Sequence, residues 1–216
     1  MSINLTYAVF GLGRYGKAVA EELVKSGAEV MAVDMDREII NDAYMDIPFC
    51  KCADITDPDA IKQLGISNFD VVIIAMANNL EASVMATMLC KEAGVKTVIA
   101  KCADDMQQRI LTRVGADKVV FPEKESGTRL AKNLLSSGFV DIIELSKNVS
   151  MIELPVKAEW VGKALSELNL RKKYSINVVA VKQNEEVSID IDPNKALEAD
   201  MTLIVVANTA KLDKLK

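Results

Sequence analysis

Three glycines in the stretch "FGLGRYGKAV", residues 10–19, have a spacing suited to binding phosphate. Gly11, Gly13 and Gly16 form G-x-G-x-x-G directly after an apolar run and at the start of an amphipathic one. In such a strand, turn and helix, the first glycine permits a tight turn and the second lets phosphate oxygens reach the backbone. The third lets the helix pack closely on the strand, with the phosphate at its positive end. The motif predicts a nucleotide site.

A carboxylate group follows the next apolar run. Asp34, with Met35 and Asp36 after it, stands about 20 residues beyond the glycines. A carboxylate at this place accepts hydrogen bonds from ribose hydroxyls and repels a 2′-phosphate. The sequence therefore favours NAD, ATP, ADP or another adenine nucleotide with a free ribose, and disfavours NADP.

Arg14, inside the glycine turn, bears on how the nucleotide is used. The helix N-terminus largely serves the pyrophosphate of a dinucleotide, whereas a guanidinium adds bidentate bonds to further or terminal phosphate oxygens. Arg14 thus favours a phosphate-sensing site. The alternative interpretation is a solvated arginine at the start of a helix.

Composition excludes several classes of function. The 216 residues include no histidine, so the commonest general acid or base and the usual imidazole metal ligand are missing. The net charge of −5 argues against nucleic acid as a partner. Apolar runs such as "VVIIAMA" fall far short of the roughly 20 residues that span a bilayer, and no secretory leader is recognisable. Cytoplasmic location, with four reduced cysteines packed as small apolar side chains, is the expectation.

The elements that must position these residues alternate along the chain. Apolar β-prone runs and helical stripes follow one another, which predicts a Rossmann-like, doubly wound parallel sheet of α/β class. Strands are predicted at 6–10, 29–33, 48–52, 70–76, 97–101 and 118–122, and helices at 14–26, 36–44, 58–65, 80–93, 104–114 and 125–138.

The alternation of single strands and helices ends after Gly138, which is expected to end the last of these helices. Strand-like runs "VDIIEL" and "SMIELPV", a helix around "KALSELNL" and strands "INVVAVK", "EVSID" and "MTLIVVA" follow. This order predicts a small α+β domain. The predicted domains are residues 1–138 and 139–216.

The chain resembles the TrkA and KtrA proteins, the regulatory subunits of bacterial potassium uptake systems. The resemblance rests on "VFGLGRYGKAVAEEL", "AVDMDREIIN", "CADITDPDAIKQLGISNFDVVIIAM", "LTRVGADKVVFPEKESGTRLA" and "LRKKYSINVVAVK". It implies an N-terminal RCK (regulator of potassium conductance) domain and a C-terminal RCK_C domain. It also implies a homo-oligomer, from a dimer to an octameric ring, below a membrane potassium-translocating subunit of Ktr or Trk type. A single RCK copy fits the KtrA-like architecture, whereas Trk-type members often carry two copies and prefer NAD or NADH.

The same resemblance implies roles for residues along the first domain. Asp34 would hold the ribose, and Arg14 would reach the γ-phosphate of ATP, either in its own subunit or in a neighbouring one. Glu123 would help to bind a cation, Mg²⁺ or a monovalent ion, beside the phosphates. The full predicted set for ATP/ADP or NAD/NADH is Gly11, Gly13, Arg14, Tyr15, Gly16, Asp34, Met35, Asp36, Asp54, Ile55, Met76, Ala77, Asn78, Lys101, Gln107 and Glu123. Helix capping by Asp54, solvation of Lys101 and a surface ion pair of Glu123 are the alternative interpretations.

In the second domain the resemblance implies a site for cyclic di-AMP at a dimer interface. The candidates are Arg171, Asn177, Val178 and Pro193. Some relatives also place a histidine there, which this chain lacks. The alternative is that "INVVAV" is simply a buried strand.

Two other functions remain to be weighed against a nucleotide-gated regulator. One is an NAD-dependent oxidoreductase with Lys101 or Tyr174 as acid or base, against which the missing histidine and the small second domain count. The other is a free-standing nucleotide-binding module of a soluble complex.

Overall fold

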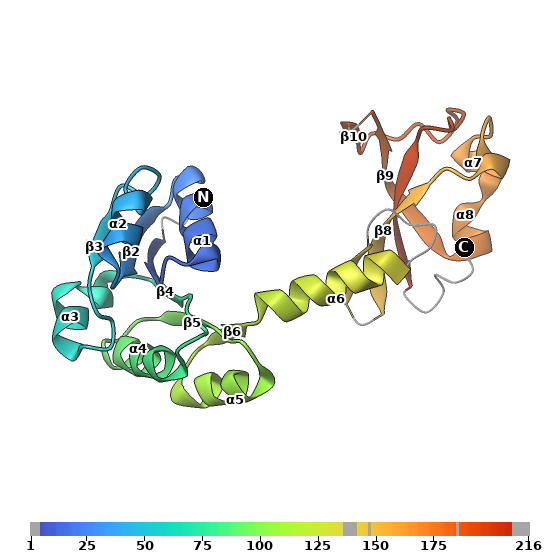
Figure 1. The fold of residues 1–216 in the computed structure, drawn as a ribbon. Helices are drawn as coiled ribbons and strands as arrows, with labels where there is room; N and C mark the ends of the chain where they lie inside the picture. Colours follow the sequence, from blue (N-terminus) through green and yellow to red (C-terminus); the bar gives the residue numbers. More distant parts are fainter. Residues whose placement is uncertain (1–4, 136–141, 147, 185, 209–216) are drawn as a thin grey trace. The chain divides into compact units, whose positions relative to one another are not determined.

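The computed structural model describes residues 5–135, 142–146, 148–184 and 186–208. It divides into two compact units, Met1–Lys124 and Glu125–Lys216, and Figure 1 labels their elements. The predicted boundary after residue 138 lies outside the described residues, and the domain limits stay a prediction.

The first unit is built on a parallel sheet in the order β3-β2-β1-β4-β5-β6. Its strands occupy the predicted regions, and the predicted Rossmann-like fold is confirmed. The strands are β1 Thr6–Phe10, β2 Glu29–Asp34, β3 Cys50–Cys52, β4 Val71–Ile74, β5 Thr97–Lys101 and β6 Lys118–Val120. The helices between them are α1 Arg14–Lys25, α2 Arg37–Ala43, α3 Pro58–Gln63, α4 Leu80–Glu92 and α5 Asp105–Val114, with a 3₁₀ turn at Ile66–Asn68.

Both faces of this sheet are covered, because successive strand residues point to opposite sides. Phe10 and Ile74 belong to one buried cluster, which includes side chains of α3, α4 and α5. Val9 and Ile73 belong to a second cluster on the other face, with side chains of α1 and α2. Figure 1 shows α4 and α5 side by side. Strands buried on both faces read as continuous apolar runs, as β4 "VVII" does.

Short polar side chains fix where four of the helices begin. Asp36, Asp57, Asn79 and Asp104 are the N-caps of α2, α3, α4 and α5, and each accepts a hydrogen bond from a backbone N–H in the first turn. Such caps contribute about 1 kcal/mol each. Helix α1 differs from these four, because its N-cap is Gly13, which has no side chain to cap the helix.

Helix α6 spans Pro122–Leu135 and begins three residues before the predicted position 125. Pro122 explains the early start, because proline at the first helical position has a suitable φ and lacks an N–H that would be unpaired there anyway. The predicted end at Gly138 lies outside the described residues.

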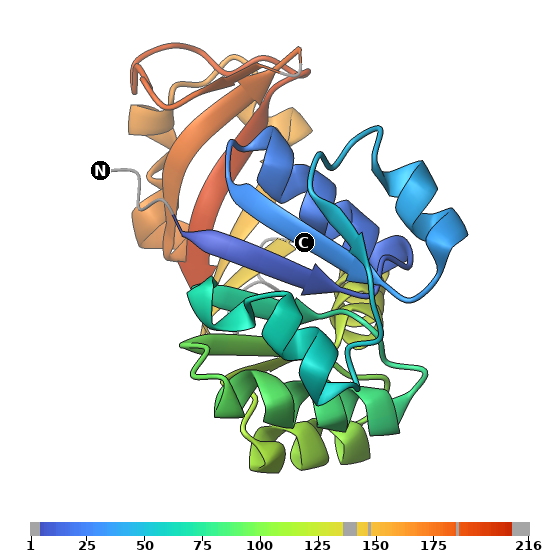
Figure 2. The same cartoon turned by 90° about the vertical axis from the view of Figure 1, so that its left-hand side faces the viewer.

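The second unit is the predicted α+β arrangement. Its antiparallel sheet has the order β10-β9-β11-β8-β7, and the long strands β9 and β11 run side by side in Figure 2. The core packs Ile152, Leu203 and Val205 against Trp160 and Leu168. The elements are β7 Ile142–Ser146, β8 Val149–Pro155, a 3₁₀ turn Ala158–Trp160, α7 Leu165–Leu168, α8 Leu170–Tyr174, β9 Ile176–Gln183, β10 Glu186–Ser188 and β11 Thr202–Asn208.

The helix predicted around "KALSELNL" is split into α7 and α8. Asn169 lies between them at φ 51°, in the left-handed region. Asparagine adopts this conformation more readily than most residues, so the chain turns there instead of continuing as one helix.

Candidate nucleotide-binding site

A large cavity of the first unit lies where the strand order reverses. β1 pairs with both β2 and β4, and open parallel sheets bind ligands at the carboxyl ends of strands beside such a reversal. The cavity measures about 870 Å³. It is lined by Gly11, Gly13, Arg14, Tyr15, Val33, Asp34, Met35, Ala53, Asp54, Ile55, Thr56, Ala75, Met76, Ala77, Asn78, Asn79, Ala82, Lys101 and Glu123.

The glycine turn has the geometry that its spacing predicts. Gly11 has φ 85°, and its N–H donates to the Val33 carbonyl at 2.8 Å. A Cβ added to Gly16 would lie 1.9 Å from the Gly11 carbonyl oxygen and 2.9 Å from Ala75 Cβ. At Gly13 an added Cβ would meet nothing within 4 Å. Gly16 is therefore needed for packing, whereas Gly13 leaves open space beside the uncapped start of α1, which suits a phosphate.

Asp34 connects the second strand to the glycine turn. The backbone N–H groups of Leu12 and Asp36 donate to its carboxylate at 2.7 and 3.0 Å. Each carboxylate oxygen keeps a further lone pair for another donor. Asp34 is thus fixed in place and can still accept bonds from ribose hydroxyls in the cavity.

Asp54 and its neighbours form the part of the cavity after β3. Thr56 donates to Asp54 from its hydroxyl at 2.7 Å and from its backbone N–H at 2.9 Å. These two bonds lower the pKa of Asp54 below its ordinary value. Ile55, only 6% exposed, adds an apolar surface. An ionised carboxylate next to an apolar wall suits an adenine ring, whose amino group is a hydrogen-bond donor.

Charged side chains gather at the opposite end of the cavity. Lys101 Nζ lies 2.6 Å from Glu123 Oε1 and 5.6 Å from the centroid of the Tyr15 ring. The hydrogen bond from Lys101 is the first cause that lowers the pKa of Glu123, and the charge of Arg14 adds to it. This end combines two cations with one carboxylate.

Most of the predicted binding residues are brought together here. Met35, Met76, Ala77 and Asn78 line the cavity as predicted, and Gly16 lies behind it in the packing of α1.

Two predicted residues serve other purposes in the described structure. The Asp36 carboxylate caps α2 by accepting the Glu38 N–H at 2.8 Å. Gln107 Oε1 accepts the Ala103 N–H at 2.9 Å. Neither residue lines the cavity.

Sequence reasoning missed several lining residues. Val33, Ala53 and Ala75 adjoin predicted residues at the strand ends, and Thr56 and Asn79 occupy turn and cap positions next to them. Val33, Ala53 and Ala75 could have been predicted from their positions at strand ends. A threonine two residues after Asp54 is typical of a turn closed by the aspartate side chain, and this pattern could have identified Thr56.

The predicted cation ligand, Glu123, is paired with a lysine. Among the described residues, no group of three or more acidic or cysteine side chains is placed to hold a metal ion. Glu123 would therefore need ligand oxygens, such as those of a polyphosphate, to complete a cation site.

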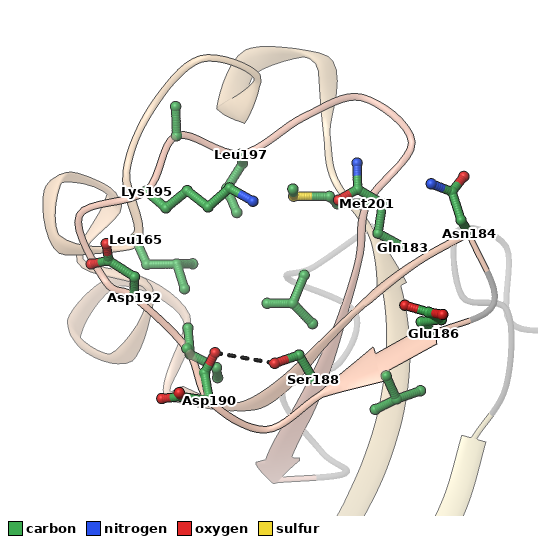
Figure 3. Close-up of a pocket in the computed structure, with 14 residues that line it drawn as sticks. Leu165, Gln183, Asn184, Glu186, Ser188, Asp190, Asp192, Lys195, Leu197 and Met201 are labelled. Carbon is green, nitrogen blue, oxygen red and sulfur yellow. Dashed lines mark hydrogen bonds between the residues drawn. The ribbon is translucent and has the colours of Figure 1, made fainter.

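The second unit has a cavity of its own, of about 320 Å³, shown in Figure 3. Its lining includes the carboxylates of Glu186, Asp190 and Asp192 and the ammonium of Lys195. The excess of negative charge disfavours a phosphodiester there. None of the predicted cyclic di-AMP residues, Arg171, Asn177, Val178 and Pro193, lines this cavity.

Those four residues are spread over a helix, a strand and a connecting segment. Arg171 is exposed on α8, Asn177 and Val178 lie in β9, and Pro193 is exposed in the segment between β10 and β11. The Pro193 carbonyl accepts the Ser166 N–H at 2.9 Å, which ties this segment to α7.

Family models match both units. The TrkA-N domain model matches residues 7–122, and the TrkA-C domain model matches residues 149–216. Ktr system potassium uptake protein C of Bacillus subtilis is 34% identical over 97% of this chain and 95% of its own length. Ktr system potassium uptake protein A of Vibrio alginolyticus is 36% identical over 97% of this chain and 96% of its own length.

Solved structures share the fold. A structure described as the GsuK channel bound to NAD is similar with a TM-score of 0.65 at 16% identity, covering 99% of this chain and 39% of that one. The TrkA-N domain of the inner membrane protein ybaL from Escherichia coli gives 0.55 at 17% identity, covering 62% of this chain and 99% of that one. Within the described residues, no helix is both long and apolar enough to cross a membrane. With matching models over both units and relatives that align almost from end to end, the chain belongs to the TrkA/Ktr family of potassium uptake proteins.

Proposed function

We propose that this chain is the nucleotide-binding regulatory subunit of a potassium uptake system and controls transport through a ligand-dependent change of an RCK ring. The single observation that carries the proposal is the cavity at the strand-order reversal, in a chain that aligns over nearly its full length with Ktr proteins. Gating of this kind requires a ligand that binds two ring states with different affinity.

The groups in the cavity favour binding over catalysis. Asp34 and Asp54 each accept two hydrogen bonds from nearby groups of the chain, and Lys101 is paired with Glu123. Of the two acids or bases suggested for an oxidoreductase, Tyr174 belongs to the second unit, where its ring centroid lies 6.1 Å from that of Trp160. Of Lys101 and Tyr174, only Lys101 lines the cavity. The regulator is therefore preferred to an enzyme.

ATP or ADP is preferred to NAD or NADH because of the charge at the phosphate end. Arg14 and Lys101 line the cavity together, and two cations match a polyphosphate better than a pyrophosphate diester. Mg²⁺ or a monovalent cation between Glu123 and the phosphates would complete the site. The cation would screen the carboxylate from the phosphates.

The assembly proposed is a homo-oligomeric ring, docked at the inner face of the membrane on a Ktr-type translocating subunit. Cyclic di-AMP is proposed as a second regulator at a dimer interface of the TrkA-C domain, where Arg171 and Asn177 would contact it.

Arg171→Ala is expected to weaken cyclic di-AMP binding at least tenfold, because a guanidinium pairs with phosphate in a bidentate manner. Calorimetry checks this, and unchanged binding contradicts the role of Arg171.

Calorimetric titration with ATP, ADP, NAD and NADH tests the nucleotide assignment. We expect ATP to bind best, and Arg14→Ala to weaken ATP binding more than ADP binding. Arg109→Ala, at an exposed arginine of α5 away from the cavity, is the matched control. Tighter binding of NADH with no effect of Arg14→Ala would instead favour a redox sensor.

Transport is tested by potassium uptake in cells that lack other uptake systems and express a Ktr-type membrane subunit. The chain is expected to raise uptake, and Gly13→Ala, which blocks the phosphate approach, to abolish this increase. Co-purification with the membrane subunit separates this function from that of a free-standing module. Activity with nicotinamide substrates but no effect on uptake would reject the proposal.

A further inference from the structure

A protein carboxylate lies beside the lysine at the end of the cavity where a phosphate is expected. Lys101 Nζ and Glu123 Oε1 are 2.6 Å apart, at the end of the cavity that also contains Arg14. Glu123 is the second residue of α6, and Lys101 is the last residue of β5. The pair therefore connects the carboxyl end of β5 to the first turn of α6.

The two partners differ in their exposure. The Lys101 side chain is 14% exposed, whereas the Glu123 side chain is 62% exposed. An ammonium so far removed from water requires a counter-charge, but an exposed carboxylate does not. Glu123 can thus leave the lysine at little cost, provided that another anion takes its place.

The Tyr15 ring supports the lysine without neutralising it. Lys101 Nζ lies 5.6 Å from the ring centroid, within the range of a cation–π contact. Tyr15 follows Arg14 in the first turn of α1, beside the uncapped helix start. The ring therefore keeps the ammonium near the place where the phosphate is expected.

We propose that Glu123 is a resident anion that holds Lys101 when the cavity is empty and is displaced from it by a nucleotide phosphate. The proposal rests on the proposed function and adds a determinant of specificity. Only a ligand whose phosphate binds Lys101 more strongly than the Glu123 carboxylate does can form a contact with this lysine. It also gives Glu123 a role that needs no metal ion. Displacement removes one of the contacts that hold the first turn of α6, where Lys124 stays paired with Asp105.

The test is calorimetric titration with ADP in the presence of EDTA. Glu123→Gln removes the competing charge and keeps the shape, so ADP affinity is expected to rise roughly two- to fivefold, the range of a single exposed ion pair. Asp105→Asn is the matched control. Asp105 forms an ion pair of the same length, 2.6 Å, with Lys124, outside the cavity.

Repeating the Glu123→Gln substitution in a Lys101→Met variant distinguishes competition for Lys101 from a general effect of charge on ADP binding. Lys101→Met is expected to weaken ADP binding, and adding Glu123→Gln to Lys101→Met is expected to give no further gain. A gain of equal size in both backgrounds would show that Glu123 acts only through its long-range charge, which overturns the proposal.

Hydrogen exchange gives an independent readout on α6. ADP is expected to increase exchange of the amides at residues 124–128 in the wild type, and to have a smaller effect in Glu123→Gln, where the ion pair with Lys101 is already missing. Equal effects in both proteins contradict the proposal. Weaker ADP binding by Glu123→Gln in EDTA also overturns it, while leaving nucleotide regulation intact. If the wild type binds none of the four nucleotides, the proposed function itself fails.

Discussion

Asp34 fastens the glycine turn to the second strand, because the Leu12 backbone N–H donates to its Oδ2 at 2.7 Å. The carboxylate expected to hold the ribose is thus also a structural part of the phosphate turn. A ligand that contacts Asp34 meets a turn that is already in place, which reduces the ordering required on binding.

Asp34→Asn is expected to weaken ADP binding by about tenfold and to lower the free energy of unfolding by about 1–2 kcal/mol, because one backbone N–H loses its acceptor. Asp36→Asn is the control, since that carboxylate caps α2 and does not line the cavity. Calorimetry and denaturant unfolding measure the two effects. Equal loss of binding in both variants would contradict the distinct roles.

Gly16→Ala and Gly13→Ala are expected to fail in different ways. At Gly16 a Cβ would lie 1.9 Å from a backbone oxygen, so the free energy of unfolding is expected to fall by about 3 kcal/mol or more. At Gly13, with φ −64° and open space, stability is expected to change by less than about 1 kcal/mol. Thermal unfolding with calorimetry distinguishes them, and ADP binding retained by Gly13→Ala would contradict the phosphate site.

Acid is expected to weaken the edge of the sheet at the amino ends of β1 and β4. The Lys96 side chain, and next the Thr6 N–H, hold the pKa of Asp70 below its ordinary 3.8. A carboxylate with a lowered pKa contributes stability above its unfolded pKa and loses this contribution as the pH falls through the folded value. Between about pH 5 and pH 2, the thermal midpoint should fall less steeply for Asp70→Asn than for the wild type. Parallel curves would contradict this.

Cys52 is expected to react first with iodoacetamide at pH 8. It is the exposed thiol of the four, and burial raises the pKa of Cys90 to about 12. Burial also raises the pKa of Cys50 and Cys102. Mass spectrometry of the folded protein should show one rapid modification, which Cys52→Ser removes. Rapid modification of Cys90 would mean that its site opens readily.

The sequence allowed the first sheet and the centre of the site to be predicted, because both depend on local signals. Apolar runs such as β4 mark strands, and the ends of β1, β2, β3, β4 and β5 contribute the residues around the cavity. Because parallel strands place their carboxyl ends at one edge of the sheet, these residues could be predicted to lie around one site.

Other details depend on choices that a pattern cannot decide. Gln107 was predicted near the ligand, but its amide oxygen bonds the Ala103 N–H at the start of α5. Asn169 fits a helical stripe, yet it adopts a left-handed conformation and divides the helix. The pairing of Lys101 with Glu123 joins residues 22 positions apart and follows only from the folded geometry.

The position of Glu123 along the chain has a consequence for how the protein is made. Every residue that lines the nucleotide cavity lies between Gly11 and Glu123, ahead of the second unit, which begins at Glu125. Synthesis proceeds from the N-terminus at roughly 5 to 20 residues per second, so the cavity is complete in the nascent chain seconds before the C-terminal unit has been translated. If the cavity binds a nucleotide as proposed, that ligand would stabilise the first unit while the ribosome is still adding the second.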